Sequence, residues 1–267
     1  PENEAVLEFT LMGPTLEFTS ETIIAITGGD FQPQVNGKPI KNYTAVYIHR
    51  GDILSFRGAR TGSRGYIAFS SYLDIPVVMG SRSTNIKCSI GGYKGRRLMD
   101  GDYVGFRIKR RYLPYYLSRT LDLDEFDQDE VTLRVIMGPQ DKSFTTAGRK
   151  TFLESEYTVT SEFDRMGCRL DGELIEHVQS GDIISDGIAF GAIQVPSAGK
   201  PIIMLADRQT TGGYTKIANV ISADFRILAQ LKAGDKVRFE KVSITAAQEA
   251  LLAQRATLRC LRSAIDR

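Results

Sequence analysis

Histidine and tryptophan are the scarcest residues here: the 267 residues include two histidines, His49 and His177, and no tryptophan. Two isolated histidines exclude a histidine-rich metal site and leave few candidates for a histidine-dependent hydrolase. The sequence also lacks the Gly-x-Ser-x-Gly turn of serine hydrolases and the P-loop of nucleotide-binding proteins. We therefore expect structural roles for both histidines and no metal site.

Cysteine pairs, long apolar runs and excess charge are missing as well. The three cysteines, Cys88, Cys168 and Cys260, lie far apart, as is typical of free thiols in a reducing compartment. No apolar run reaches the roughly 18 residues of a membrane span, and no signal peptide opens the sequence. The net charge of +2 does not indicate a protein that binds nucleic acid. These absences favour a cytoplasmic protein that binds neither membrane nor nucleic acid.

The sequence contains an internal duplication, because several short segments recur in the same order. The matched pairs of segments are 11–14 with 136–139, 35–40 with 170–175, 51–55 with 181–185, 66–69 with 202–205, and 98–106 with 231–239. Matches that keep their order indicate two copies of one unit. We predict a first lobe over residues 1–115, a linker over 116–130 and a second lobe over 131–267.

The linker is acidic, and like charges between duplicated units are typical of an exposed connection. Its acidic block consists of Asp122, Asp124, Glu125, Asp127, Asp129 and Glu130. The same block could instead attract a basic partner.

Short β-strands dominate the predicted secondary structure. The dipeptides Asn36-Gly37 and Asp171-Gly172 indicate hairpins, because both residues of a type I′ turn need positive φ. Alternating or apolar runs over 44–48 and 202–205 indicate strands around a core. Many short strands favour a closed or sandwich-like β architecture over βαβ units.

Few helices are expected. The first spans 144–154, with Thr145 or Thr146 as its cap, and the second spans 222–231. A C-terminal helix runs from Thr245 to about Ile265 and opens with a Thr245–Gln248 capping box. Its apolar face could dock on the protein's own barrel or on a partner.

Two similar loops carry the most chemistry. Residues 80–92 and 206–214 each place an arginine before hydroxyl side chains and end in a Gly-Gly pair followed by tyrosine. Glycine pairs let consecutive backbone amides be exposed, arginine adds a planar cation, and hydroxyls add short donors. Such loops suit a carboxylate, a phosphate or a ureido carbonyl.

In the first loop, Arg82 could clamp a carboxylate while Ser83 or Thr84 orients a carbonyl. The alternative is an arginine that fixes its own loop to a backbone carbonyl or to a local aspartate. Gly91-Gly92-Tyr93 could form an anion-binding nest or a plain glycine turn.

In the second loop, Asp207 could act as a general base or as a partner of Arg208, and Gln209 could hydrogen-bond an amide. The alternative is a strained turn that satisfies its own backbone. The neighbouring pair Asp164-Arg165 could line the same site or form a surface ion pair. The residues that complete the predicted loop site are Thr210, Thr211, Gly212 and Gly213.

These motifs resemble one protein family. The resembling segments are 80–84, 91–96, 161–170, 191–196 and 209–214. They resemble the family known as allophanate hydrolase subunit 2, the C subunit of 5-oxoprolinase or biotin-dependent carboxyltransferase. The resemblance runs from near Pro1 to about Lys241 and implies two cyclophilin-like β-barrel lobes.

The resemblance also implies an enzyme component that is inactive alone. Family members work with a B-type partner protein and, in 5-oxoprolinase, with an A-type protein as well, and together these open 5-oxo-L-proline to L-glutamate with ATP. The alternatives are the carboxyltransferase module of a biotin-dependent urea carboxylase and a non-catalytic regulator that binds a kinase-inhibitor partner. No Ala-Met-Lys-Met motif occurs, so biotin would sit on another chain. We expect this chain alone to bind no cofactor.

The resemblance suggests roles for individual residues as well. Arg82 and Arg208 would bind anionic groups, Gln209 with Thr210 would orient the amide, and Asp207 would take or give a proton.

Overall fold

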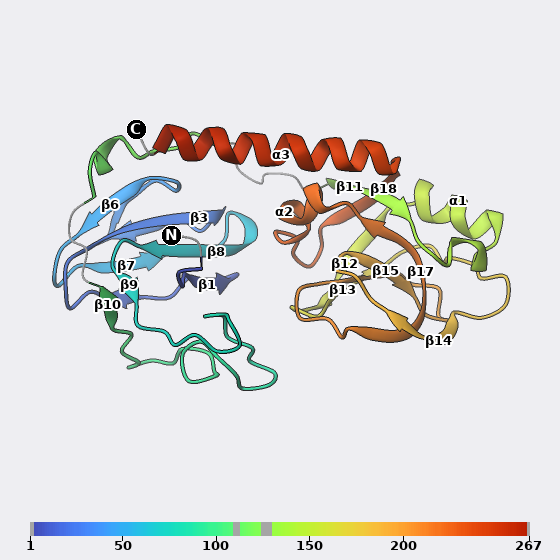
Figure 1. The fold of residues 1–267 in the computed structure, drawn as a ribbon, viewed down its shortest axis with the longest axis horizontal. Coiled ribbons are helices and arrows are strands. Elements are labelled where there is room, and N and C mark those ends of the chain that lie inside the picture. Colours follow the sequence, from blue (N-terminus) through green and yellow to red (C-terminus); the bar gives the residue numbers. More distant parts are fainter. Residues whose placement is uncertain (1–2, 109–112, 124–129, 266–267) are drawn as a thin grey trace. The chain divides into compact units, whose positions relative to one another are not determined.

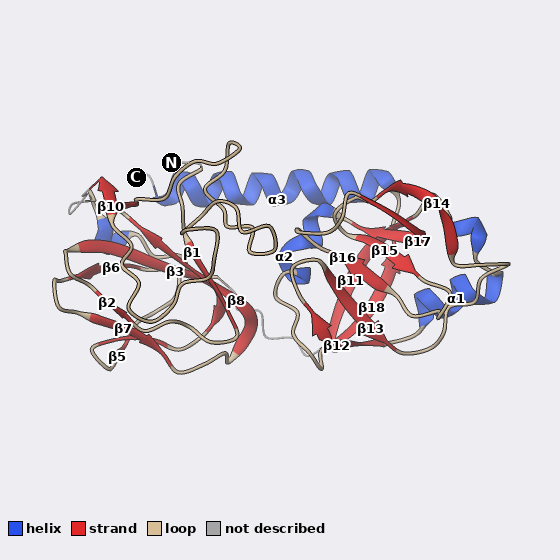
Figure 2. Ribbon diagram, turned by 90° about the horizontal axis from the view of Figure 1, so that it is seen from below, coloured by secondary structure: helices blue, strands red, loops and turns tan. Residues whose placement is uncertain are grey.

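The computed structural model describes residues 3–108, 113–123 and 130–265, and its fold is mainly β with few helices (Figure 2). The chain forms two compact units, residues 1–126 with 261–267 and residues 127–260. Each unit has its own hydrophobic core. The predicted fold class is thereby confirmed. Among the described residues, no helix combines the length and the apolar character needed to cross a membrane.

The first unit is built on two four-stranded sheets. One sheet has the order β1-β8-β3-β6, with β1 at Leu7–Thr10, β3 at Thr22–Asp30, β6 at Ala45–Ile48 and β8 at Thr61–Phe69 (Figure 1). The other has the order β2-β7-β4-β5, with β2 at Leu16–Glu17, β4 at Pro33–Val35, β5 at Lys38–Pro39 and β7 at Ile53–Phe56. A short pair, β9 at Tyr72–Leu73 and β10 at Phe106–Ile108, completes the strands described in this unit.

Alternating apolar residues of these strands bury one face, as the periodicity of half-buried strands requires. The core of the first unit consists of Phe9, Phe18, Ile24, Ile26, Phe31, Ile48, Leu54 and Ile67. The predicted Asn36-Gly37 turn joins β4 to β5, with φ values of 50° and 75°. This hairpin is confirmed.

The predicted linker is in part bound to the first unit. Ala45 N–H donates to the carbonyl of Arg119, and Leu121 N–H donates to the carbonyl of Tyr43. A 3₁₀ turn, Tyr116–Ser118, precedes these contacts. Residues 124–129 of the acidic block lie outside the described residues.

Strands of the second unit close into a barrel. They are β11 at Glu130–Met137, β12 at Tyr157–Phe163, β13 at Gly167–Asp171, β14 at Asp182–Gly187, β15 at Ala192–Val195, β16 at Ile202–Met204, β17 at Thr211–Val220 and β18 at Lys236–Lys241. The order β11-β18-β12-β13-β16-β15-β17 closes because β17 also pairs with β11, while β14 pairs with β17 outside this ring.

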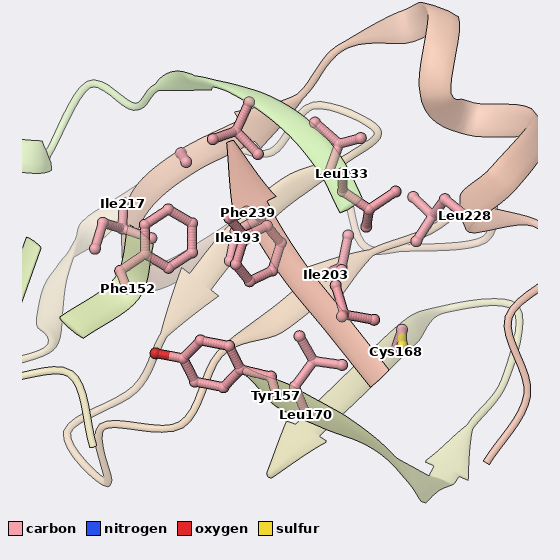
Figure 3. Close-up of a cluster of buried hydrophobic side chains, with 14 of the residues drawn as sticks. Leu133, Phe152, Tyr157, Cys168, Leu170, Ile193, Ile203, Ile217, Leu228 and Phe239 are labelled. Carbon is pink, nitrogen blue, oxygen red and sulfur yellow. The ribbon is translucent and has the colours of Figure 1, made fainter. Parts of the chain in front are cut away.

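The barrel of the second unit is filled by apolar side chains (Figure 3). Leu133, Phe152, Tyr157, Ile193, Ile217 and Phe239 are all labelled there and are all buried. The Phe152 and Phe239 rings stack at 4.5 Å between centroids. Burial raises the pKa of the Tyr157 hydroxyl.

Two sequence interpretations of strand relations are wrong. Asp171-Gly172 does not centre a hairpin, because β13 pairs with β12 before it and with the distant β16, not with the next strand. The match of 66–69 with 202–205 is not a structural equivalence either. Residues 66–69 belong to β8, which pairs with β1 and β3, whereas 202–204 form the short β16, which pairs with β13 and β15.

The helices occur near the predicted positions. Helix α1, Thr146–Glu154, begins after Thr145, whose Oγ1 accepts from Gly148 N–H at 2.9 Å, as predicted. The second helix is shorter than predicted: α2 spans Phe225–Leu228 after a 3₁₀ turn over Ser222–Asp224. Another 3₁₀ turn spans Asp141–Ser143.

The C-terminal helix α3 spans Ile244–Ile265. Ser243 caps it, because its Oγ accepts from Ala246 N–H at 3.1 Å, so the predicted Thr245 cap is wrong. Within the second unit, Gln254 Nε2 donates to the carbonyl of Ala223 at 3.1 Å.

Candidate functional site

The loop between β16 and β17, residues 205–210, contributes Asp207 to an ion pair with Arg165. The two residues are too far apart in the sequence for this pairing to be predicted. Arg165, in the β12–β13 turn, donates from Nε to Asp207 Oδ2 at 3.0 Å and from Nη2 to Oδ1 at 3.4 Å. Asp207 N–H donates to the carbonyl of Arg165 at 2.8 Å. Both side chains are partly exposed. A two-point contact fixes the orientation of the Asp207 carboxylate while leaving it accessible to a small molecule.

Arg208, predicted to bind an anion, donates instead to the main chain. Its Nε donates to the carbonyl of Ile188 at 3.0 Å and its Nη1 to the carbonyl of Leu205 at 3.3 Å. The guanidinium also lies 5.9 Å from the ring centroid of Phe190. Arg208 therefore ties segment 188–190 to the loop.

Gln209 and Thr210 lead directly into β17, whose first three residues are Thr211, Gly212 and Gly213. The carbonyl of Thr210 accepts from Ile188 N–H at 2.9 Å, and Thr211 pairs with Gly187. Neither Gly212 nor Gly213 has positive φ, so no left-handed turn requires these glycines. A methyl group on Gly212 would lie 2.7 Å from Ile188 Cδ1, too close for a real contact. Gly212 therefore makes room for the end of the Ile188 side chain, which would have to move if a methyl group were present.

Gln194 lies near Gly212 as well, because its Nε2 would be 3.2 Å from a methyl group there. It lies within β15, and 1% of the residue is exposed. Among the described residues, its Nε2 has no hydrogen-bond partner. The sequence signal was a single amide inside the apolar run Ala192–Val195.

Asp164 serves its own turn. Its Oδ1 accepts from Met166 N–H at 2.7 Å and from Gly167 N–H at 3.0 Å. These bonds shape the turn that presents Arg165 to Asp207.

In the first unit, Arg82 is anchored within its own unit. Its Nη1 donates to the carbonyl of Ile75, and its Nε lies 3.8 Å from the Glu4 carboxylate. Arg107 binds the same carboxylate at 2.8 Å. The alternative of an arginine that fixes a loop therefore describes Arg82 well.

Ser83 and Thr84 lie against Gly91 and Gly92 in the first loop. Gly91 and Gly92 have φ values of 68° and 54°. A methyl group on Gly91 would lie 2.5 Å from the carbonyl oxygen of Ser83, and one on Gly92 would collide with the side chain of Thr84. Only glycine fits both positions.

Tyr93 follows this glycine pair and lies beside Arg96, whose guanidinium is 5.3 Å from the ring centroid. Arg96 donates to both Asp102 oxygens, at 2.6 and 2.8 Å. Together with Met99 N–H, this guanidinium lowers the pKa of the Asp102 carboxyl. The two groups form a closed pair that holds the loop.

The histidine expectation also holds for His177. Its Nε2 lies 3.0 Å from the carbonyl of Val195 and 3.1 Å from Thr215 Oγ1, and its ring packs on Phe144. In the described part of the chain, no group of three or more His, Cys, Asp or Glu is placed to hold a metal ion.

Comparison with known proteins adds the family. Residues 1–241 match the family described as carboxyltransferase domain, subdomain A and B. The chain is 34% identical to the C subunit of 5-oxoprolinase from Haemophilus influenzae, over 91% of this chain and 77% of that protein. It is 32% identical to the C subunit of 5-oxoprolinase from Escherichia coli, over 93% of this chain and 78% of that protein.

Among solved structures, the urea amidolyase of K. lactis superposes with a TM-score of 0.87 at 26% identity. The match covers 96% of this chain and 17% of that much longer protein. The family resemblance seen in the sequence motifs is thereby confirmed. This chain belongs to the family of carboxyltransferase domains with subdomains A and B.

Proposed function

We propose that this chain is one component of an ATP-dependent 5-oxoprolinase that opens 5-oxo-L-proline to L-glutamate. The similarity to the C subunit of 5-oxoprolinase over 91% of the chain supports this proposal most strongly. Partner proteins of the B type and the A type complete the enzyme, and the chain alone is inactive. ATP is consumed by the complex.

The chemistry explains why such a loop suits the reaction. Water adds to the lactam carbonyl, the ring C–N bond breaks, and the nitrogen leaves as the amine of glutamate, while a second water converts ATP to ADP and phosphate. Negative charge develops on the lactam oxygen, and a proton moves to the leaving nitrogen. The loop must therefore supply a proton carrier and hydrogen-bond donors.

Asp207 is the proton carrier in this proposal, because Arg165 holds its carboxylate in one orientation. Gln209 and Thr210, exposed beside it, orient the amide. Arg208 supports the loop through the carbonyls of Ile188 and Leu205. We assign the binding of an anionic group to Ser83 and Thr84 with Gly91 and Gly92, which share one surface loop.

Reconstitution tests the proposal. The chain is purified with its A-type and B-type partner proteins, and glutamate formation from 5-oxoproline is followed with and without ATP. We expect activity only when all three proteins and ATP are present. Glutamate formation by a mixture that omits this chain would reject the proposal.

A second function is favoured by the TM-score of 0.87 to a urea amidolyase. In that alternative, the chain is the carboxyltransferase module of a biotin-dependent carboxylase and transfers a carboxylate from carboxybiotin on another chain to urea or a similar amide. Urea-dependent ATP turnover with a biotin carboxylase and carrier, but no glutamate formation with the oxoprolinase partners, would select it.

A further inference from the structure

Gln194 occupies an unusual place on β15. Its neighbours Ile193 and Val195 are fully buried in the barrel core, and Ile193 is seen there in Figure 3. Side chains alternate along a strand, so Gln194 shares the other face with Ala192. On that face Ala192 belongs to a small apolar cluster with Ile188 and Met204.

A bulge lies beside Gln194. Ile193 pairs with Ala218 of β17, but Gln194 pairs with Lys216, so Ile217 is passed over. Bulges re-aim side chains and are frequent next to active sites. The extra residue, Ile217, belongs to β17, so it is β17 that departs from regular pairing beside Gln194.

The Gln194 side chain is directed toward the loop that holds Asp207. A methyl group on Gly212 would lie 3.2 Å from Gln194 Nε2 and 3.7 Å from Gln209 Nε2. Two side-chain amides thus approach the same glycine from β15 and from the loop. Of these two, Gln194 is buried and Gln209 is exposed.

A buried amide without a partner lowers stability, because its N–H groups lose their hydrogen bonds to water. Among the described residues, Gln194 Nε2 has no such partner. Natural proteins pair nearly all buried polar groups, so an exception calls for an explanation. A ligand that accepts a hydrogen bond at this position supplies one.

We propose that Gln194 Nε2 donates a hydrogen bond to the carbonyl oxygen of a neutral amide, which makes Gln194 a substrate-binding residue beside Asp207. This inference rests on the proposed function and identifies the oxygen as that of the lactam. Nε2 only donates, so its ligand must be an acceptor.

A neutral carbonyl fits the surroundings better than a carboxylate. Arg165 already binds Asp207, and Arg208 binds the carbonyls of Ile188 and Leu205. The apolar side chains of Ile188 and Met204 lie on the same face as Gln194. A carboxylate would lose its hydration there without gaining a free cation from these two arginines.

Two measurements on Gln194→Met and Gln194→Leu test the proposal. The reconstituted complex is titrated with 5-oxoproline, with 2-pyrrolidone, which keeps the lactam and lacks the carboxylate, and with proline, which lacks the ring carbonyl; urea serves as a further neutral amide. Thermal unfolding of the chain is then measured without ligand. Gln230→Met is the matched control, since Gln230 is another mostly buried glutamine of the second unit, 8% exposed.

We expect both Gln194 variants to weaken binding of 5-oxoproline and 2-pyrrolidone about tenfold and to leave proline binding unchanged. At least one should raise the unfolding midpoint by about 2–5 °C, because an unpartnered amide has been removed. Gln230→Met should leave lactam binding unchanged.

The proposal would be overturned if the Gln194 variants bound the lactams as tightly as wild type does. It would also be overturned if they bound proline more weakly, which would indicate recognition of the carboxylate, or if both variants had a lower unfolding midpoint. Wild-type protein that binds neither lactam nor urea would do the same. The proposed function fails separately, through absence of glutamate formation, because 2-pyrrolidone and urea binding still report on Gln194 in that case.

Discussion

The two Gly-Gly-Tyr segments of this chain have the same sequence and serve different purposes. Gly91 and Gly92 both adopt left-handed φ values in an irregular loop of the first unit. Gly212 and Gly213 lie in strand β17 of the second unit, where Gly212 makes room for Ile188 and the Gln194 amide. The first pair is selected by backbone conformation and the second by close packing.

The arginines of the two loops make similar contacts, but the side chains near them differ. Arg82 and Arg208 both donate to backbone carbonyls. Arg82 shares the Glu4 carboxylate with Arg107, whereas the second loop keeps an oriented Asp207. Strand β15 near that loop carries the buried Gln194 amide, whose Nε2 has no partner among the described residues. This difference supports our proposal that the second loop carries the proton.

The largest expected difference between the units comes from removing the partner of each aspartate. Arg165→Met should lower kcat for glutamate formation about tenfold, because Asp207 loses its fixed orientation. Arg96→Met, which frees Asp102 in the first unit, should leave kcat within about threefold of wild type. Equal losses of kcat in the two variants, measured on assembled complexes, would show that the Arg165–Asp207 pair has no special role in the reaction.

The glycines offer a test through stability. Gly92→Ala should lower the free energy of unfolding by about 2 kcal/mol, since alanine is strained at this φ and its methyl group meets Thr84. Gly212→Ala should cost about 1 kcal/mol, because only the flexible ends of Ile188 and Gln194 must move. Urea unfolding of both variants measures the two values. A larger cost at Gly212 would reverse the two explanations.

The smallest effect concerns pH. Hydrogen bonds from Arg96 and then Met99 N–H lower the pKa of Asp102 in the folded state. The stabilisation is therefore complete above the unfolded-state pKa of about 4 and is lost as pH falls through the lower folded-state pKa. Asp102→Asn should destabilise the protein more at pH 7 than at pH 3, as seen by urea unfolding. The same difference at both pH values would contradict this linkage.

Local sequence signals predicted local structure well. The Asn36-Gly37 turn, the Thr145 cap and the extent of the C-terminal helix follow from turn and capping chemistry within a few residues. Capping rules alone could not choose between Ser243 and Thr245, because both are followed by a plausible first turn.

Long-range pairing was beyond those signals. Strand β13, which ends at Asp171, does not pair with the next strand in the sequence. No local signal indicates that it pairs with β16. The Arg165–Asp207 pair likewise depends on bringing the β12–β13 turn to the end of β16. Pro196 and Gly199 indicate a turn after Gln194, while the strand that carries Gln194 continues to Val195.

Glutamate formation by a reconstituted complex that contains Asp207→Asn tests whether Asp207 transfers the proton in this reaction. The substitution keeps the size of the side chain and removes its ability to carry a proton at neutral pH. We predict a rate about a hundredfold below wild type, with the complex still assembled, which is within the usual contribution of a general acid or base. A wild-type rate would show that Asp207 carries no proton in this reaction and would contradict the account.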